Sequence, residues 1–282
     1  MRIAVTGSSG FTGKKLVKHL QYLNHEVIKI DLEEGIDATN YNDLKEIPKF
    51  DILYHLAAKS FVPDSYLKPL DFYKVNFNST LNTLELCRNF NAKYIFISSY
   101  VYGNPQYLPI DEHHPITSFN PYADTKIIGE NLCRSYHKYF NLNVTIVRPF
   151  NIYGPEQTHN FLIPFIFNQA VKGKIELSDP NPKRDLIFID DLIELYASLI
   201  AYDNSKLEIF NAGYGISYSV REIVEYIANL FPSPIEVNFL NKIRPNEVAD
   251  SVSNNVKAKT LLNWKPQIDL PQGLSLIYSS LK

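Results

Sequence analysis

The sequence predicts an α/β fold built on a doubly wound parallel sheet, with a smaller lobe toward the C-terminus. Three observations support this. Short apolar runs of strand length alternate with helical stretches up to about residue 150. The runs are nearly continuously apolar, as in parallel strands covered on both faces. Prolines then break the alternation, at Pro149, Pro155 and Pro164.

The expected strands of the main sheet are the runs 3–5, 26–30, 51–57, 93–98 and 143–148. Helical periodicity over 76–91 and 121–140 predicts right-handed crossover helices between them. Two later segments, 187–190 and 208–213, are expected to return to the main sheet. The stretch 217–231 and the C-terminal tail would then form the smaller lobe.

The first strand runs into a glycine-rich turn, residues 6–13, that opens a helix. Its spacing is typical of a Rossmann dinucleotide site. Gly7 would make the tight turn, Gly10 would let the backbone approach a pyrophosphate, and Gly13 would let the helix pack on the strand. The free N–H groups at the helix start favour phosphate. By itself, an ordinary glycine-rich turn would explain the same residues.

The second strand ends in Asp31, about 20 residues beyond the turn, where a carboxylate can hold the ribose hydroxyls of adenosine. The residues that follow, Leu32, Glu33 and Glu34, offer no positive charge to a 2′-phosphate. The pattern favours NAD over NADP. A strand-end acid that caps a turn is the alternative explanation for Asp31.

Composition narrows the class of partner. The net charge is −2, from 28 Lys and Arg against 30 Asp and Glu, without a basic run, which argues against nucleic-acid or anionic-membrane partners. No apolar stretch approaches the roughly 18 residues of a membrane span. Met1 leads straight into a strand, so we expect no signal peptide. Cys87 and Cys133 lack metal-ligand spacing, so we expect no metal site. We expect both to be free thiols in a cytoplasmic protein.

A serine, a tyrosine and a lysine complete the candidate site. Ser98 ends the fourth strand, and Tyr122 and Lys126 lie four apart in a helical stretch, on one helix face. A nearby positive charge lowers the pKa of a phenol from its ordinary value of about 10 and makes it a usable base. Alone, the spacing would describe a surface pair. With the glycine turn and Asp31 it favours hydride-transfer chemistry.

These features together resemble the extended short-chain dehydrogenase/reductases, in particular the NAD-dependent epimerase/dehydratase group acting on nucleotide sugars. The resemblance covers nearly the whole chain. Its markers are residues 6–13, Asp31, 55–58, 75–76, 98–103, 122–126 with 129–130, 148–155, 184–185, Asp190, 244–247 and 262–266.

The resemblance implies roles at matching positions. Tyr122 would be the base and acid, Lys126 its partner and a ribose ligand, and Ser98 the proton shuttle. His55, His113 and His114 are expected to be structural or loop residues. The implied cofactor-binding residues are Gly7, Ser9, Gly10, Phe11, Gly13, Asp31, Asp37, Ala38, Leu56, Ala57, Ala58, Asn76, Tyr122 and Lys126.

For the substrate, the resemblance implies contacts from Ser98, Asn151, Arg184 and Arg244. The two guanidinium groups suit a bidentate clamp on a diphosphate. A surface salt bridge is the alternative for each arginine. Asn246 and Glu247 depart from the family's usual Gly-Asp, which puts the local turn in question.

The implied activity is epimerisation of a nucleotide sugar at C4, through transient oxidation to a 4-keto sugar with NAD. Ser99 and Tyr100 stand where dehydratases of the family carry Asp-Glu, which argues against dehydration. An NAD(P)H-dependent reductase of a 4-keto-6-deoxy nucleotide sugar would use the same residues. A catalytically silent dinucleotide-binding protein is the rival of another class. The base and the sugar are not specified by the sequence.

The expected domains follow from this assignment. Residues 1–150, with returning segments at about 185–215, would form the NAD-binding Rossmann domain. Residues 151–184 and 216–282 would form the substrate-binding lobe. The resemblance also implies a homodimer that pairs helices 76–91 and 121–140 of two chains.

Overall fold

The computed structural model describes residues 1–202, 206–243 and 247–281. The chain forms two compact units, each assembled from separate stretches. Unit 1 comprises residues 1–102, 116–149 and 193–210, and unit 2 comprises 103–115, 150–192 and 211–282. Three stretches that we expected in the Rossmann domain, 103–115, 185–192 and 211–215, therefore cluster with unit 2.

A six-stranded sheet forms the centre of unit 1. Its order is β2-β1-β3-β4-β5-β9, and the four neighbouring pairs from β2 to β5 are parallel. The chain moves outward from β1 to β2 and then crosses back to β3, so β1 and β3 flank the topological switch point where such sheets bind ligands. The strands are β1 (Arg2–Thr6), β2 (Glu26–Ile30), β3 (Ile52–His55), β4 (Lys93–Ile97), β5 (Val144–Pro149) and β9 (Glu208–Ala212).

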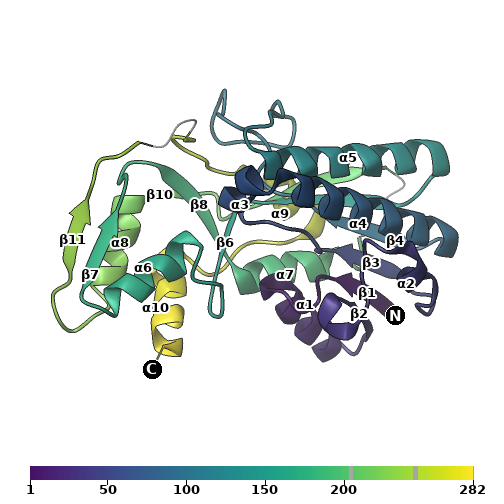
Figure 1. The fold of residues 1–282 in the computed structure, drawn as a ribbon, viewed down its shortest axis with the longest axis horizontal. Helices are drawn as coiled ribbons and strands as arrows, with labels where there is room; N and C mark the ends of the chain where they lie inside the picture. The colour runs from purple at the N-terminus through teal and green to yellow at the C-terminus, as the bar shows by residue number, and fades with distance from the viewer. Residues whose placement is uncertain (203–205, 244–246, 282) are drawn as a thin grey trace. The chain divides into compact units, whose positions relative to one another are not determined.

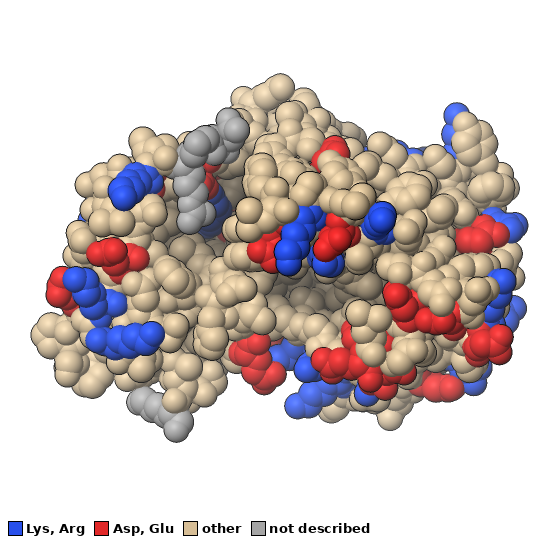
Figure 2. Space-filling view, viewed as in Figure 1, with Lys and Arg blue, Asp and Glu red and all other residues tan. Residues whose placement is uncertain are grey.

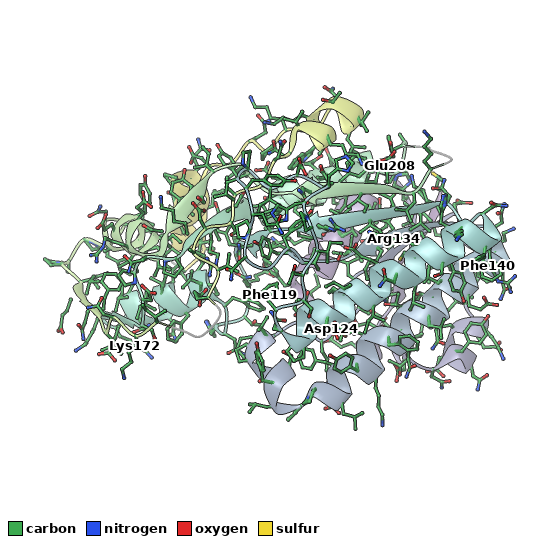
Figure 3. All side chains as sticks on the ribbon, turned by 90° about the horizontal axis from the view of Figure 1, so that it is seen from above. Phe119, Asp124, Arg134, Phe140, Lys172 and Glu208 are labelled. Carbon is green, nitrogen blue, oxygen red and sulfur yellow. The ribbon has the colours of Figure 1, made fainter. Side chains whose placement is uncertain are left out.

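Two long helices, α4 (Pro69–Phe90) and α5 (Pro121–Phe140), lie side by side in unit 1 (Figure 1). Figure 3 shows Asp124, Arg134 and Phe140 along α5. Asn120 caps α5 by accepting a hydrogen bond from the Ala123 N–H at 2.7 Å. The other helices that contribute to unit 1 are α1 (Phe11–Tyr22), η1 (Leu32–Glu34), α2 (Tyr41–Lys45), α3 (Val62–Leu67) and α7 (Ile189–Ser198).

The core of unit 1 joins this helix pair to the sheet. Cys87 of α4 and Cys133 of α5 are buried free thiols in one apolar cluster with Phe96 of β4. Gly129 lets α5 approach closely, because a Cβ there would collide with the Phe96 ring. The sheet therefore fixes the position of the helix that carries Tyr122.

Unit 2 contains two small sheets. The first has the order β10-β8-β6, formed by β6 (Asn151–Tyr153), β8 (Lys183–Phe188) and β10 (Ser217–Ser219). The second pairs β7 (Lys174–Leu177) with β11 (Glu236–Phe239) in parallel. Its helices are α6 (Leu162–Ala170), α8 (Val220–Ala228), α9 (Val256–Leu262) and α10 (Leu270–Ser280).

One of the two predicted returns to the main sheet was wrong. Segment 208–213 joins the main sheet as β9, as expected, whereas segment 187–190 ends β8 and begins α7. An apolar run shows that a strand is buried but does not name its partner. Asp185 fixes β8 within unit 2, since its carboxylate accepts hydrogen bonds from Tyr214 N, Gly215 N, Ser253 N and Ser253 Oγ at 2.6–2.9 Å.

The surface carries charges of both signs. Figure 2 shows acidic and basic side chains interspersed over the face that it draws. Within the residues that the structure describes, no helix is both long enough and apolar enough to cross a bilayer.

Candidate active site

The glycine turn has the geometry expected of a dinucleotide site. Gly7 has a φ of +66°, and a Cβ there would lie 2.9 Å from the Ala57 backbone nitrogen. A Cβ on Gly13 would collide with the Gly7 carbonyl oxygen. The turn after β1 is therefore pressed against the segment after β3. Only glycine fits at these two positions.

The start of α1 offers donors to an anion. Gly10 is its N-cap and provides no side-chain hydrogen bond, and the first turn, with Phe11, contains no acid. Ser8 Oγ is buried beside it and has no hydrogen-bond partner among the described residues. Free helix N–H groups and an orphaned hydroxyl are what a diphosphate would satisfy. These residues fit NAD.

Asp31 supports the same turn. Its two carboxylate oxygens accept hydrogen bonds at 3.1 Å, one from Ser9 N and the other from Glu33 N. The alternative capping role is thus present, because Asp31 is the N-cap of η1. Each oxygen can still accept a ribose hydroxyl, since a carboxylate has about four acceptor positions.

Other predicted cofactor residues form the walls of this region. Ala38 is buried, and the Asp37 carboxylate accepts hydrogen bonds from Thr39 N and Thr39 Oγ1 at 2.8 Å. After β3, the backbone N–H groups of Leu56 and Ala57 both donate to Thr6 Oγ1, at 3.1 and 3.0 Å. Ala58 follows in the same partly exposed loop.

Asn76 is buried and fully hydrogen-bonded within unit 1. Its amide donates to Lys59 O and to Thr125 Oγ1, and it accepts from Lys59 N. Because both amide hydrogens are used, Asn76 clamps the loop after β3 to α5. Contact with the nicotinamide ribose remains a prediction.

Ser99, rather than Ser98, meets Tyr122. The Ser99 side chain is the one of the two that influences the Tyr122 phenol. Burial raises the pKa of Tyr122, and the bond to Ser99 lowers it. Sequence reasoning placed the shuttle at Ser98. Consecutive side chains leave a strand end in opposite directions, so the spacing alone does not say which serine faces the site.

Ser98 points instead into a buried polar cluster. Its hydroxyl donates to Glu130 Oε1 at 2.7 Å. Glu130 is paired with Arg148, whose Nε and Nη2 donate to the two carboxylate oxygens at 2.8 and 2.6 Å. Arg148 Nη1 also donates to Tyr102 at 3.0 Å. The cluster ties α5 to β5 and to the end of β4.

Lys126 is buried one turn after Tyr122. Its Nζ donates to the Ile97 carbonyl at 2.7 Å and lies 5.1 Å from the centroid of the Phe96 ring. Burial lowers the pKa of Lys126 to about 8, against the opposing effect of Glu130. The ammonium thus lies beneath the strand end that precedes the two serines.

The two predicted substrate residues of unit 2 that the structure describes, Asn151 and Arg184, both have hydrogen-bond partners. Asn151 Nδ2 donates to the Asp185 carbonyl at 3.1 Å. Arg184 Nη1 donates to the Lys183 and Val248 carbonyls, and its Nη2 forms an ion pair with Glu247. Arg244 lies outside the described residues. The salt-bridge alternative therefore holds for Arg184 in this structure.

Unit 2 contains a cavity of about 400 Å³. No predicted site residue lines it, although Lys259 and Lys265 do. Among the described residues, no three His, Cys, Asp or Glu side chains gather as metal ligands.

Known proteins are similar to this chain over nearly its whole length. A model described as the NAD dependent epimerase/dehydratase family matches residues 3–213. A protein of Methanocaldococcus jannaschii, provisionally named UDP-glucose 4-epimerase, is 32% identical over 99% of this chain and 98% of its own. GDP-6-deoxy-D-mannose reductase of Pseudomonas aeruginosa is 28% identical over 99% and 96%.

A solved structure agrees as well. UDP-glucuronic acid 4-epimerase from Bacillus cereus, in complex with UDP-glucuronic acid and NAD, superposes with a TM-score of 0.89 at 28% identity, over 99% of this chain and 98% of that one. The predicted fold class and NAD as cofactor are confirmed. The chain belongs to the NAD dependent epimerase/dehydratase family.

Proposed function

We propose that this protein is an NAD-dependent nucleotide-sugar 4-epimerase. The observation that carries the proposal is the position of Lys126, which is buried one helical turn after Tyr122 on α5 and donates to the Ile97 carbonyl at the end of β4, just before Ser98 and Ser99. A phenol, a hydroxyl and an ammonium at the end of β4 form a set that moves protons between oxygen atoms. The dehydratase acid pair is missing, because Ser99 and Tyr100 hold those positions.

The cofactor would be held by residues at the switch point. The turn from Gly7 to Gly13 and the start of α1 would bind the diphosphate, and Asp31 would bind the adenosine ribose. When bound, NAD supplies the acceptor and donor of hydride. A 2′-phosphate would meet the carboxylate of Asp31, which favours NAD over NADP.

Tyr122 would take the proton from the sugar hydroxyl and later return it. Burial holds its phenol neutral, so the free protein stores the proton on oxygen. The positive charges of Lys126 and of the bound nicotinamide would shift that balance toward phenolate. Ser99, in contact with the phenol, would relay the proton between the sugar oxygen and Tyr122.

Unit 2 would hold the sugar nucleotide. Arg184, Arg244 and Asn151 would contact the diphosphate, so that the 4-keto sugar turns over without leaving. Arg184 is paired with Glu247 in this structure, so the substrate diphosphate would replace the Glu247 carboxylate at the guanidinium. Ser98, buried against Glu130, is left out of this set.

The test begins with the nucleotide released from the denatured protein, which we expect to be NAD. The intact protein is then incubated with UDP- and GDP-sugars, and products are followed by NMR without added cofactor. We expect interconversion of 4-epimers with no net NADH absorbance. Tyr122→Phe should reduce kcat at least about a hundredfold while NAD stays bound. Wild-type turnover in this variant would remove Tyr122 from the mechanism.

The reductase remains the second candidate, because a reductase of GDP-6-deoxy-D-mannose is similar over nearly the whole chain. It predicts that a 4-keto-6-deoxy nucleotide sugar is reduced with one NAD(P)H consumed per turnover. If ordinary 4-hydroxy sugars are inert and that stoichiometry is found, the reductase assignment replaces the epimerase.

We propose that the protein is a cytoplasmic homodimer. Apolar side chains of α4 and α5 are exposed, among them Leu70, Phe77, Tyr139 and Phe140, and a second copy would cover them. The free thiols Cys87 and Cys133 suit a reducing compartment. A light-scattering mass of one chain at micromolar concentration would contradict the dimer.

A further inference from the structure

His55 lies at the centre of a buried hydrogen-bond chain that the chemistry above does not use. It ends β3 and is 1% exposed. Its Nδ1 lies 2.8 Å from Thr6 Oγ1 on β1, and its Nε2 lies 3.1 Å from Thr80 Oγ1 on α4. The ring stacks with Tyr94 and Phe96 of β4. Its two nitrogens therefore connect the glycine-turn strand to a helix.

The direction of each hydrogen bond follows from counting donors. Thr6 Oγ1 already accepts the N–H groups of Leu56 and Ala57. The Thr6 hydroxyl must therefore donate its own hydrogen to Nδ1 of His55, which leaves that nitrogen without a proton. The remaining ring proton is then on Nε2 and is donated to Thr80 Oγ1.

The chain continues to the helix that carries Tyr122. Thr80 Oγ1 donates to the Asn76 carbonyl at 2.7 Å. The Asn76 amide donates to Thr125 Oγ1 at 2.8 Å, and Thr125 donates to the Tyr122 carbonyl at 2.7 Å. A continuous set of buried partners thus runs from the cofactor turn to the first turn of α5.

We propose that His55 is a positioning residue, held as the neutral Nε2–H tautomer, that fixes the cofactor turn relative to the helix of Tyr122. The expected effect of His55 on turnover rests on the proposed epimerase activity. The expected effect on NAD binding rests on Thr6, because Thr6 holds the backbone of Leu56 and Ala57 against Gly7.

The surroundings keep the ring neutral. Burial lowers the pKa of His55 well below its ordinary value, and the charge of Lys126 lowers it further. A proton on Nδ1 would also give Thr6 Oγ1 a third donor and leave the Thr6 hydrogen without an acceptor. The rings of Tyr94 and Phe96 that stack on His55 carry no negative charge that would stabilise a protonated imidazole.

The first experiment needs no substrate. In protein labelled with ¹⁵N-histidine, long-range proton–nitrogen NMR distinguishes the two tautomers and follows titration. We expect the His55 signals to show Nε2–H and to stay unchanged from about pH 5.5 to 9. An Nδ1–H tautomer, or protonation of His55 within that range, would overturn the proposal.

The second experiment removes one contact. Thr80→Val keeps the shape of the side chain but deletes the partner of Nε2. We expect kcat to fall about tenfold with KM unchanged, since small displacements of a reacting group are costly. Thr83→Val is the matched control, because Thr83 is equally buried on α4 but bonds to Ser79, Thr80 and Tyr94.

The two variants together decide the question. Equal kcat values for Thr80→Val and Thr83→Val would contradict the positioning role, even if both unfold at a lower temperature. Thr6→Val tests the other end and should lose bound NAD during gel filtration, whereas Thr83→Val should retain it. If the wild-type protein epimerises no nucleotide sugar, the proposed function fails while the NMR and NAD-retention results still judge the role of His55.

Discussion

Two adjacent serines at the end of β4 have different surroundings, and this difference can be measured. Ser99 meets the Tyr122 phenol, whereas Ser98 donates into the buried Glu130 carboxylate. Ser99→Ala should reduce kcat about a hundredfold through loss of proton relay. Ser98→Ala should chiefly reduce stability. Comparing kcat with the urea midpoint for both variants tests this, and the reverse pattern would restore Ser98 as the shuttle.

Burial of the Lys126 ammonium reduces the stability of the fold. Burial lowers its pKa from an ordinary value of 10.5 to about 8. At about 1.4 kcal/mol per pKa unit, a buried ammonium at pH 7 costs about 3 kcal/mol. Lys126→Met should therefore raise the free energy of unfolding by about 2 kcal/mol at pH 7, after the lost hydrogen bond to Ile97 is deducted.

The stability advantage of Lys126→Met over the wild type should decrease as pH rises. Between about pH 8 and 10.5 the folded wild type holds a neutral amine while the unfolded chain still binds a proton, so wild-type stability rises with pH. The advantage of Lys126→Met should shrink over that range and vanish above it. Denaturant titrations at pH 7 and pH 10 measure the difference. A constant advantage would mean that the ammonium is not penalised by burial.

Among the elements, α5 depends on a buried ion pair. Glu130 and Arg148 are each about 1% exposed and share two hydrogen bonds. Glu130→Gln leaves the Arg148 charge without its partner and should reduce the free energy of unfolding by about 3–5 kcal/mol. Glu85→Gln is the control, because its pair with Arg88 on α4 is exposed and should contribute little to stability. Equal urea midpoints for the two variants would refute this.

The ion pair between Arg184 of β8 and Glu247 gives a prediction about substrate binding. Glu247 occupies the Arg184 guanidinium that would bind diphosphate. Glu247→Gln should free that group and lower KM for the nucleotide sugar by up to about fivefold, equal to about 1 kcal/mol, with kcat little changed. A higher KM would show instead that Glu247 holds Arg184 in its binding position.

For the whole molecule, the sequence predicted what depends on local chemistry. Apolar runs located the strands, and the turn at Gly7 located the switch point, because only glycine tolerates that backbone approach. Side-chain direction and pairing between distant segments were not predictable. Spacing alone did not separate Ser98 from Ser99, nor place β8 outside the main sheet, nor pair Arg184 with Glu247. Such choices depend on contacts far apart in sequence.

The interleaved units also set the order in which a new chain can fold. Ile110 belongs to unit 2, and its backbone bonds to Val252 and Asn254, about 140 residues further on. At about 5–20 residues per second, a ribosome delivers those partners roughly 7–28 s later. The edge of β5 likewise waits for β9 until residue 212 has been made. We therefore expect the sheet of unit 1 and the Ile110 contacts of unit 2 to form late in synthesis. Until then, chaperones would have to protect the unpaired edge of β5 from aggregation.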